Sequence, residues 1–444
     1  MDFKSAYIPI GVGTFHLESA EKAFNDSISL LKELDEGIAF PEEMLLTADK
    51  LKAYISSLKP DLAIVQNLTF ANAAYMSEIL STFDCPVLLW TLREPVIDGT
   101  RLRLNSLTGA FSAANTLRGF GRNFEYVFGS PDENEVKEKI SATIDAAKLK
   151  KAMHGLKLAQ VGHTPQGFGF GRALDLDMLK TFGVTAESIE ARELIDKAKT
   201  FTDDDVAPYL ADAGKRICGL DKIDPKNVCD FARLYKAYSD YVKENNVGAL
   251  ASRCWPDFFT AFGTPVCAVL SILNDLGIPC ACEADSYGAL SMFAASFLAK
   301  KSVFFGDPVS LDEEENTVTF WHCGMAPCSM AREDTGAAAG LHCNRKIGPT
   351  LDFGCKASDK VTIFRIGRNP DGSFRFFLSS GKALDKPKQF NGTSIVVRTD
   401  TPSKTIVENA VKDGWEPHFV IAPDNIVSRI KALGNMLGIE VLEY

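Results

Sequence analysis

Four ionisable side chains in the C-terminal half of the chain have the types and the sequence context of a metal site. Glu283 and Asp307 each follow a short apolar run, "IPCAC" and "SVFFG". His322 ends the run "TVTFWH", and His418 begins "HFVIA". Two carboxylates that meet need a cation or a shared proton, and carboxylates with imidazoles suit Mn²⁺, Fe²⁺, Co²⁺ or Mg²⁺. The sequence therefore predicts a divalent-metal site. The alternative is a chance pair of loop-end acids and two core histidines whose hydrogen bonds are satisfied within the protein.

The elements around the two acids predict how they would be positioned. Residues 278–282 read as a buried parallel strand, 286–301 as a crossover helix with Ser286 available as its N-cap, and 302–306 as the next strand. In such a βαβ unit, both acids lie at the carboxyl ends of neighbouring strands ~4.8 Å apart. Open α/β sheets bind their ligands at that edge.

The rest of the chain predicts an α/β fold with three domains. Strand-like and helix-like runs alternate over 1–155 and again over 156–308, which predicts two Rossmann-like domains with parallel sheets. The polar run 129–155 reads as a long exposed helix at their boundary. Residues 309–444 are rich in short strands and turns, which predicts a β-rich, barrel-like C-terminal domain. The central domain would carry the two carboxylates and the last domain the two histidines.

Composition excludes several classes of partner. The net charge of −10 disfavours nucleic acid and anionic membrane surfaces. No run reaches the ~18 apolar residues of a membrane span, and the start "MDFKSAYIPIGVG" does not resemble a signal peptide, so we expect a cytoplasmic protein. An odd number of cysteines, eleven, favours reduced thiols over a disulfide framework.

Four segments resemble the active-site segments of the L-fucose isomerase and L-arabinose isomerase superfamily. They are "CEADSYGAL", "FFGDP", "FWHCGMAPCSM" and "PHFVIAPD", and "GTFHLE" near the start resembles a turn of the arabinose isomerases. The resemblance implies that Glu283, Asp307 and His418 bind a divalent metal. We expect this metal to be Mn²⁺, or else Co²⁺, Fe²⁺ or Mg²⁺. The arabinose isomerases have a further histidine in this set, and the resemblance assigns its position to His322. It also implies two α/β domains with a β-rich third, and a homo-oligomer with sites near subunit interfaces.

The activity that this resemblance implies is aldose–ketose isomerisation through a cis-enediol. Glu283 and Asp307 are the expected proton-transfer groups, and His418 is expected to be a ligand only. His322 is either a further ligand or a hydrogen-bond partner of the substrate. The sugar itself stays open between a deoxy-sugar, a pentose and an anionic hexose such as a sulfonated one.

Further residues are candidates for binding the sugar. Arg253 and Trp255 in "SRCWPDFF" follow another strand and could contact a polar or anionic group, or else anchor a loop beside a surface ion pair. Trp90, Arg93 and His16 lie in the first domain. The superfamily resemblance makes these three possible contributors to the site of a neighbouring subunit.

Three other interpretations compete with the isomerase. The loop "QGFGFGR" departs from the dinucleotide pattern G-x-G-x-x-G, so we expect no nicotinamide cofactor and a backbone-shaping loop near the site instead. The run "HCGMAPC" with later cysteines could form a soft zinc site, but its spacing fits no usual knuckle. A non-catalytic sugar-binding or regulatory protein with the isomerase fold is the main alternative function.

Overall fold

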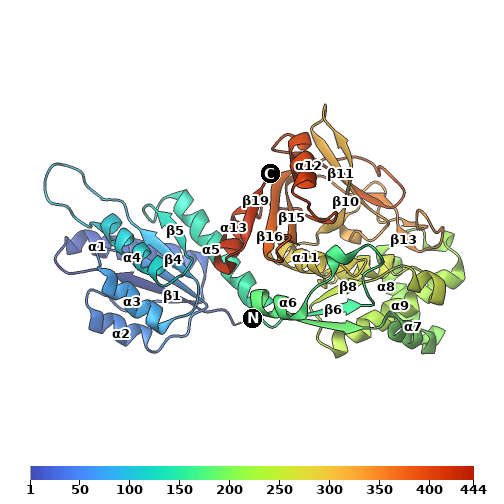
Figure 1. Ribbon diagram of the computed structural model, residues 1–444, viewed down its shortest axis with the longest axis horizontal. Coiled ribbons are helices and arrows are strands. Elements are labelled where there is room, and N and C mark those ends of the chain that lie inside the picture. Colours follow the sequence, from blue (N-terminus) through green and yellow to red (C-terminus); the bar gives the residue numbers. More distant parts are fainter. Residues whose placement is uncertain (1) are drawn as a thin grey trace. The chain divides into compact units, whose positions relative to one another are not determined.

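The computed structural model describes residues 2–444 and divides into two compact units (Figure 1). The N-terminal unit runs to Ala152 and includes Ser428–Ile439, and the large unit comprises Met153–Val427 with Glu440–Tyr444. Both units combine helices with sheets, so the predicted α/β class is confirmed. The finer division at 155 and 308 into three domains stays a prediction.

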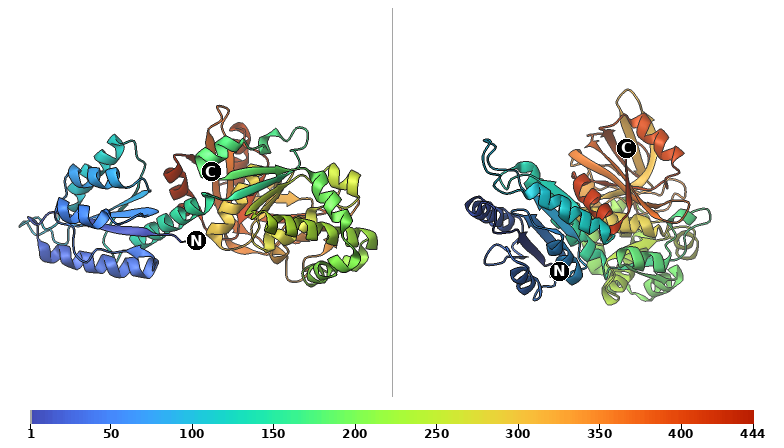
Figure 2. Two further views of the ribbon diagram at one scale, coloured as in Figure 1. Left: turned by 90° about the horizontal axis from the view of Figure 1, so that it is seen from below. Right: turned by 60° about the vertical axis from the view of Figure 1, so that its left-hand side comes forward.

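A five-stranded parallel sheet forms the centre of the N-terminal unit. Helices cover both of its faces (Figure 2), which is why its central strands are continuous apolar runs. In spatial order the strands are β2 (Ile38–Ala39), β1 (Ser5–Ile10), β3 (Leu62–Asn67), β4 (Val87–Thr91) and β5 (Glu125–Phe128). The helices are α1 (Leu17–Leu34), α2 (Ala48–Ile55), α3 (Ala73–Thr82), α4 (Ser106–Gly119) and α5 (Asn134–Met153), joined by most of α13 (Val427–Leu437).

Helix α5 is present where the sequence predicts a long helix, but the prediction that it is exposed is wrong. Val136, Ile140 and Ile144 are buried in the core beneath the sheet. Their spacing of four places them on one side of the helix. The charged residues on the other side of the helix make the segment polar on average, so the apolar stripe is recognised only when the helical repeat of about 3.6 residues is considered.

A four-stranded parallel sheet begins the large unit. Its spatial order is β7 (Thr185–Ile189), β6 (Lys157–Val161), β8 (Ala249–Ser252) and β9 (Cys280–Cys282). The accompanying helices are α6 (Asp175–Phe182), α7 (Ala191–Thr200), α8 (Asp203–Arg216), α9 (Pro225–Glu244) and α10 (Cys267–Asp275). Short helical turns are η1 (Gly169–Gly171), η2 (Leu220–Lys222), η3 (Phe258–Phe262) and η4 (Cys328–Met330). Among residues 2–444, no helix is both long enough and apolar enough to cross a membrane.

The second sheet of the large unit is mainly antiparallel, and six of its strands form a closed ring. They pair in the order β17 (Thr393–Thr399), β11 (Thr317–His322), β10 (Phe304–Asp312), β18 (Phe419–Ala422), β15 (Ser358–Arg368) and β16 (Phe374–Ala383). The ring closes because β16 also pairs with β17. Two short strands, β14 (Phe353–Gly354) and β19 (Glu440–Glu443), add to it in parallel, and β12 (Ala339–Gly340) pairs with β13 (Thr350–Leu351).

The predicted βαβ unit around the two acids is wrong, because β9 and β10 belong to different sheets. Helix α11 (Ser286–Ala299) connects them and packs against β8 and β9 on one side and β15 and β18 on the other. Its sequence "SYGALSMFAASFLA" has no charged residue, as expected of a helix that is buried except on one side, where Phe293, Ser296 and Phe297 are partly exposed. Helix α11 therefore joins the parallel sheet to the strand ring.

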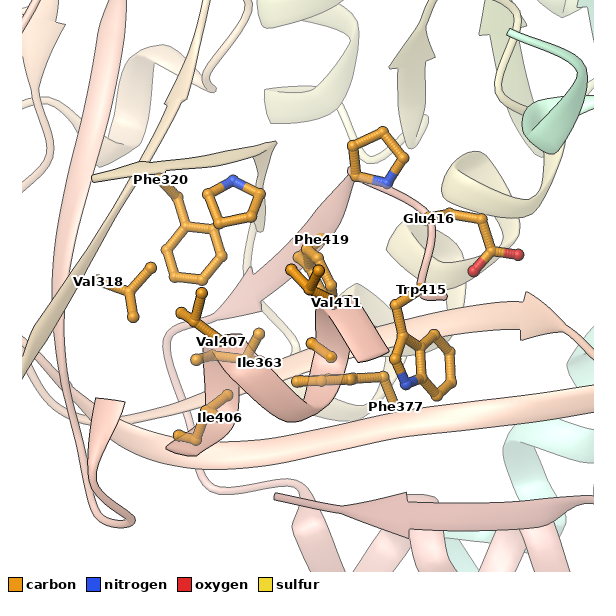
Figure 3. A pocket seen from close by; sticks show the side chains of 13 residues that line it. Val318, Phe320, Ile363, Phe377, Ile406, Val407, Val411, Trp415, Glu416 and Phe419 are labelled. Atoms are coloured by element: carbon orange, nitrogen blue, oxygen red, sulfur yellow. The ribbon is translucent and has the colours of Figure 1, made fainter. Parts of the chain in front are cut away.

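An apolar cavity of about 200 Å³ lies between helix α12 (Ser403–Lys412) and the strand ring (Figure 3). Phe320, Phe377 and Phe419 line it, and Glu416 is the one ionisable residue in its wall. Glu416 Oε1 accepts a hydrogen bond from the backbone N–H of Arg368 at 2.9 Å. A wall of this composition has no set of groups for acid–base chemistry, so the site lies elsewhere.

Candidate active site

The four residues predicted to form a metal site converge on the imidazole of His418. Its Nε2 lies 3.0 Å from Glu283 Oε2 and 3.5 Å from Asp307 Oδ1. The ring of His322 is 5.9 Å from the ring of His418, measured between centroids. His322 and His418 are buried, and Glu283 is half-buried. The structure thus brings together residues from four separate segments of the large unit.

Strand pairing in the ring explains how Asp307, His322 and His418 meet. Strand β10 pairs with β18 through Gly306 and Phe419 and with β11 through Asp307 and Trp321. The residues next to these partners therefore lie side by side. The sequence predicts Asp307 at the end of a strand. This position is wrong, because β10 continues to Asp312 and Asp307 lies within it.

Glu283 follows the three-residue strand β9 in a tight turn. Glu283 and Ala284 have φ angles of 58° and 54°, a left-handed conformation that costs of order 1–3 kcal/mol per residue outside glycine. The turn aims the carboxylate at His418, and the indole N–H of Trp255 donates to Glu283 Oε1 at 3.1 Å. Local backbone strain at this position is a common property of functional sites.

Asp285 contacts the imidazole of His418 at Nδ1, the ring nitrogen that does not face Glu283 and Asp307. Its Oδ2 is 2.8 Å from His418 Nδ1. The guanidinium of Arg365 donates to both carboxylate oxygens of Asp285, at 2.6 and 3.0 Å. Asp285 and Arg365 are 1% and 0% exposed, so each compensates the other's buried charge. A carboxylate at Nδ1 sets the tautomer and leaves Nε2 for the cluster, as in many metal sites.

Asp285 also caps helix α11, since its Oδ1 accepts from the N–H of Gly288 at 2.8 Å. The N-cap is therefore Asp285, and the prediction of Ser286 is wrong by one residue. Sequence reasoning also missed Arg365. A signal was present, because an arginine inside the apolar run "KVTIFRIG" needs a buried partner.

The surroundings of His418 separate the pKa values of the nearby acids. Burial raises the pKa of Glu283, but the hydrogen bond from His418 and the charges of both histidines outweigh it and lower the pKa overall. Burial dominates at Asp307 and raises its pKa. Burial lowers the pKa of His418, but its hydrogen bonds to Asp285 and Glu283 outweigh this effect and raise the pKa to about 9.

His322 makes a contact that restricts its tautomer. The backbone N–H of Cys323 donates to His322 Nδ1 at 3.0 Å. When the ring is neutral and Nδ1 accepts this bond, the proton lies on Nε2, and a metal could be bound through Nε2 only if that proton moved to Nδ1 or left. An Nε2–H group is a hydrogen-bond donor.

Glu283, His322 and His418 can hold a metal ion. Each offers a ligand atom within 4.8 Å of the other two, so small side-chain movements would bring all three to the ~2.0–2.2 Å at which such atoms ligate one ion. One carboxylate and two imidazoles are a donor set for borderline divalent cations. This is the single group of three or more such residues found within 2–444, and it includes no cysteine. The geometry gives no support to a thiolate zinc site.

The glycine-rich loop forms a wall of the site, as predicted. The rings of Phe168 and Phe170 lie 6.4 and 5.4 Å from the ring of His418, and Phe168 packs edge-on against Trp255 at 5.8 Å. A Cβ atom at Gly171 would come within 2.8 Å of the Asp285 Cα. The loop therefore approaches the site so closely that only glycine fits there.

Arg253 and Trp255, predicted to bind the sugar, differ in their surroundings. Arg253 Nε lies 2.5 Å from Asp257 Oδ2, so its charge is compensated. Trp255 faces Glu283 on one side, and the guanidinium of Arg345, which sequence reasoning missed, lies 5.4 Å from its ring centroid. A substrate contact by Arg253 or Trp255 stays a prediction.

The three residues proposed to contribute from a neighbouring subunit lie in the N-terminal unit. Trp90 is fully buried, and its indole N–H donates to the Gly129 carbonyl. Arg93 forms a two-point ion pair with Glu133. His16 accepts the N–H of Ser19 as the N-cap of α1. A role for them in trans stays a prediction.

Several known proteins are similar to this chain along its full length. A sulfoquinovose isomerase of a Clostridium species (strain MSTE9) is 56% identical, covering 100% of this chain and 99% of that protein. Sulfoquinovose isomerases of Priestia megaterium and Alkalicoccus urumqiensis are 37% and 35% identical, covering 99% and 98% of this chain and 98% of each relative. No protein-family model matches the chain.

A solved glucose–galactose binding protein of Geobacillus stearothermophilus is 14% identical, covering 67% of this chain and 92% of that chain, with a TM-score of 0.16. A score this low supports no statement about the fold. The full-length relatives, in contrast, define the class: the chain is an enzyme, an aldose–ketose sugar isomerase. It belongs to the sulfoquinovose isomerase family. The non-catalytic and nicotinamide-dependent alternatives therefore lose their support.

Removing the charge of Asp285 should destabilise the protein and weaken metal binding together. Asp285→Asn leaves the Arg365 guanidinium buried without a counter-charge, which should lower the free energy of unfolding by about 3–5 kcal/mol. It also weakens the acceptor at His418 Nδ1, which should reduce metal affinity about 10–100-fold. Denaturant unfolding and Mn²⁺ titration measure the two effects.

The double variant Asp285→Asn/Arg365→Met is the matched control, since it removes both charges. It should recover part of the lost stability without recovering the affinity for Mn²⁺. Equal stability of Asp285→Asn and the unmodified protein would contradict the role assigned to this pair.

Metal binding should release a proton from His418. With a pKa of about 9 in the metal-free protein, the imidazole is charged at neutral pH and must lose a proton to coordinate. Affinity for Mn²⁺ should rise about tenfold per pH unit between about pH 6.5 and 8.5. Calorimetry in two buffers with different ionisation heats counts the protons released, and a pH-independent affinity would contradict this expectation.

Proposed function

We propose that this enzyme interconverts sulfoquinovose, a glucose derivative with a sulfonate at C6, and the corresponding 2-ketose. The observation that carries the proposal is the 56% identity over the whole chain to a protein named sulfoquinovose isomerase. The convergence of Glu283, Asp307 and His418 supports it, because isomerisation needs proton-transfer groups at one point. The four segments named above further support a place in the L-fucose and L-arabinose isomerase superfamily.

The proposed cofactor is Mn²⁺ or another divalent cation such as Co²⁺, Fe²⁺ or Mg²⁺. Glu283 and His418 would be its central ligands, with Asp307 beside the same His418 nitrogen. Such an ion supplies Lewis-acid polarisation of a carbonyl and of adjacent hydroxyl oxygens. Asp285 keeps the Nε2 of His418 directed at this point.

Conversion of the aldose to the ketose moves a carbon-bound proton from C2 to C1 and a hydroxyl proton from the C2 oxygen to the C1 oxygen. Asp307 has the raised pKa, so it can both take the carbon-bound proton and return it, with an enediol between the two steps. Each carboxylate has two oxygens and can face a cation and a substrate at once. Glu283 is held by Trp255 and His418 and stays ionised because its pKa is lowered.

His322 is proposed to donate a hydrogen bond to a substrate oxygen rather than to complete the ligand set. The support is the Cys323 N–H bound to Nδ1, which leaves the ring proton on Nε2. In this position His322 would hold an oxygen of the open-chain sugar while the proton moves. Phe168 and Phe170 would exclude water from the same face of His418.

The proposed activity depends on a metal and on Glu283. With sulfoquinovose as substrate, we expect conversion to the ketose in the presence of Mn²⁺, loss of activity in EDTA, and recovery on adding the metal back. Glu283→Gln should lower kcat by about 10²–10⁴-fold, since it removes a ligand and an ionised group together. Nuclear magnetic resonance of the sugar follows the reaction, and full turnover in a metal-stripped sample would contradict the proposed mechanism.

The two histidines should respond differently to the same substitution. His418→Gln should lose bound metal, whereas His322→Gln should keep it and lose turnover, because a glutamine amide still donates a hydrogen bond but positions it poorly. Metal content by mass spectrometry and kcat on sulfoquinovose separate the two variants. Equal metal loss in both would make His322 a ligand.

A further inference from the structure

Binding of a sulfonate requires a cationic side chain that is not already paired with a carboxylate of the protein. The sulfonate of the proposed substrate is ionised at every physiological pH, so its recognition differs from that of a neutral sugar hydroxyl. The arginine expected for this task, Arg253, is paired with Asp257 at 2.5 Å. Arg365 is buried against Asp285. Neither guanidinium offers an uncompensated charge to a ligand.

Arg345 is an uncompensated cation beside the site. Its side chain is exposed, and its guanidinium carbon lies 5.4 Å from the ring centroid of Trp255 and 4.9 Å from that of Phe259. No carboxylate of the described residues forms an ion pair with it. Aromatic rings hold a guanidinium by cation–π attraction while its N–H edge stays free for a two-point bond to an oxyanion. Arg345 is thus held in place without being neutralised.

Trp255 links this cation to the reacting end of the site. The same indole that lies under Arg345 donates its N–H to Glu283 Oε1 at 3.1 Å. One ring therefore separates the guanidinium from the cluster that handles C1 and C2. The sulfonate of a six-carbon sugar is at the opposite end of the chain from C1, so an anion-binding group is needed at a distance from the cluster rather than within it.

The turn that carries Arg345 is fixed by its own hydrogen bonds. The N–H of Lys346 donates to the His342 carbonyl, and the N–H of His342 donates to the Ile347 carbonyl, both at 2.9 Å. The buried ring of His342 packs edge-on against Phe259 at 5.0 Å. A turn anchored in this way presents the guanidinium with little freedom to lose on binding.

We propose that Arg345, stacked on Trp255 and Phe259, binds the sulfonate of the substrate and makes the enzyme select an anionic sugar over the neutral one. The proposal rests on the proposed function for the identity of the anion. The assignment differs from the sequence-based expectation, in which Arg253 had this role. Arg253 instead fixes the loop through Asp257.

The test compares sulfoquinovose with 6-deoxyglucose, which is the same sugar without the sulfonate. For Arg345→Gln, kcat/KM on sulfoquinovose should fall about 10–100-fold, mainly through a higher KM, because one charge-assisted two-point contact is lost. Turnover of 6-deoxyglucose should stay within about twofold. Arg345→Lys keeps the charge but not the planar fork and should give an intermediate loss.

Lys346→Gln is the matched control, since it removes one positive charge from the same exposed turn. It should change kcat/KM on sulfoquinovose by less than about twofold. Thermal unfolding of each variant verifies that the turn substitutions leave the fold intact. An equal fall on both sugars for Arg345→Gln, or a loss of sulfonate selectivity in Arg253→Gln but not in Arg345→Gln, would overturn the assignment.

The test also separates this inference from the proposed function. Wild-type protein that neither binds nor isomerises sulfoquinovose overturns the proposed function, and the inference with it. Wild-type protein that isomerises sulfoquinovose, with an Arg345→Gln variant that does so equally well, overturns the inference alone.

Discussion

The buried contact between Asp285 and His418 is the interaction on which the candidate site depends. A carboxylate with almost no exposure is tolerated only with its charge compensated, and Arg365 does this through two hydrogen bonds. The compensated carboxylate then fixes the imidazole, which in turn contacts Glu283 and Asp307. If Arg365 or Asp285 changed, the orientation of His418 and the spacing of both acids would change with it.

This interaction also explains why helix α11 is so apolar. Asp285 is its N-cap, so the position of the carboxylate is set by the position of the helix. The helix is packed between the parallel sheet, which supplies Glu283, and the strand ring, which supplies Arg365 and His418. A helix without charged residues can be buried on both sides. The apolar sequence of α11 therefore lets the helix pack against both sheets at once, which fixes the position of one sheet relative to the other.

The composition of the site was more accessible to sequence reasoning than its geometry. Glu283, Asp307, His322 and His418 could be found because each borders an apolar run, although β10 continues past Asp307. The pairing of the strands could not be predicted, since periodicity identifies a strand but not its partner. Strands β9 and β10, expected to be neighbours, belong to different sheets. The pair Asp285–Arg365 spans 80 positions in the sequence, beyond any local pattern. The Arg253–Asp257 pair, in contrast, lies four residues apart and was within reach.

Unequal contact with His418, together with burial, explains how two neighbouring carboxylates acquire different properties. If Glu283 and Asp307 were equivalent, their mutual repulsion would leave both partly protonated and neither well defined. His418 breaks the equivalence, because it hydrogen-bonds Glu283 at 3.0 Å and lies 3.5 Å from Asp307. The pKa of Glu283 is lowered and that of Asp307 is raised. Proton transfer at neutral pH needs one group that stays ionised and one that exchanges a proton. The imidazole keeps Glu283 ionised, and burial raises the pKa of Asp307 against the opposing effect of the His418 charge.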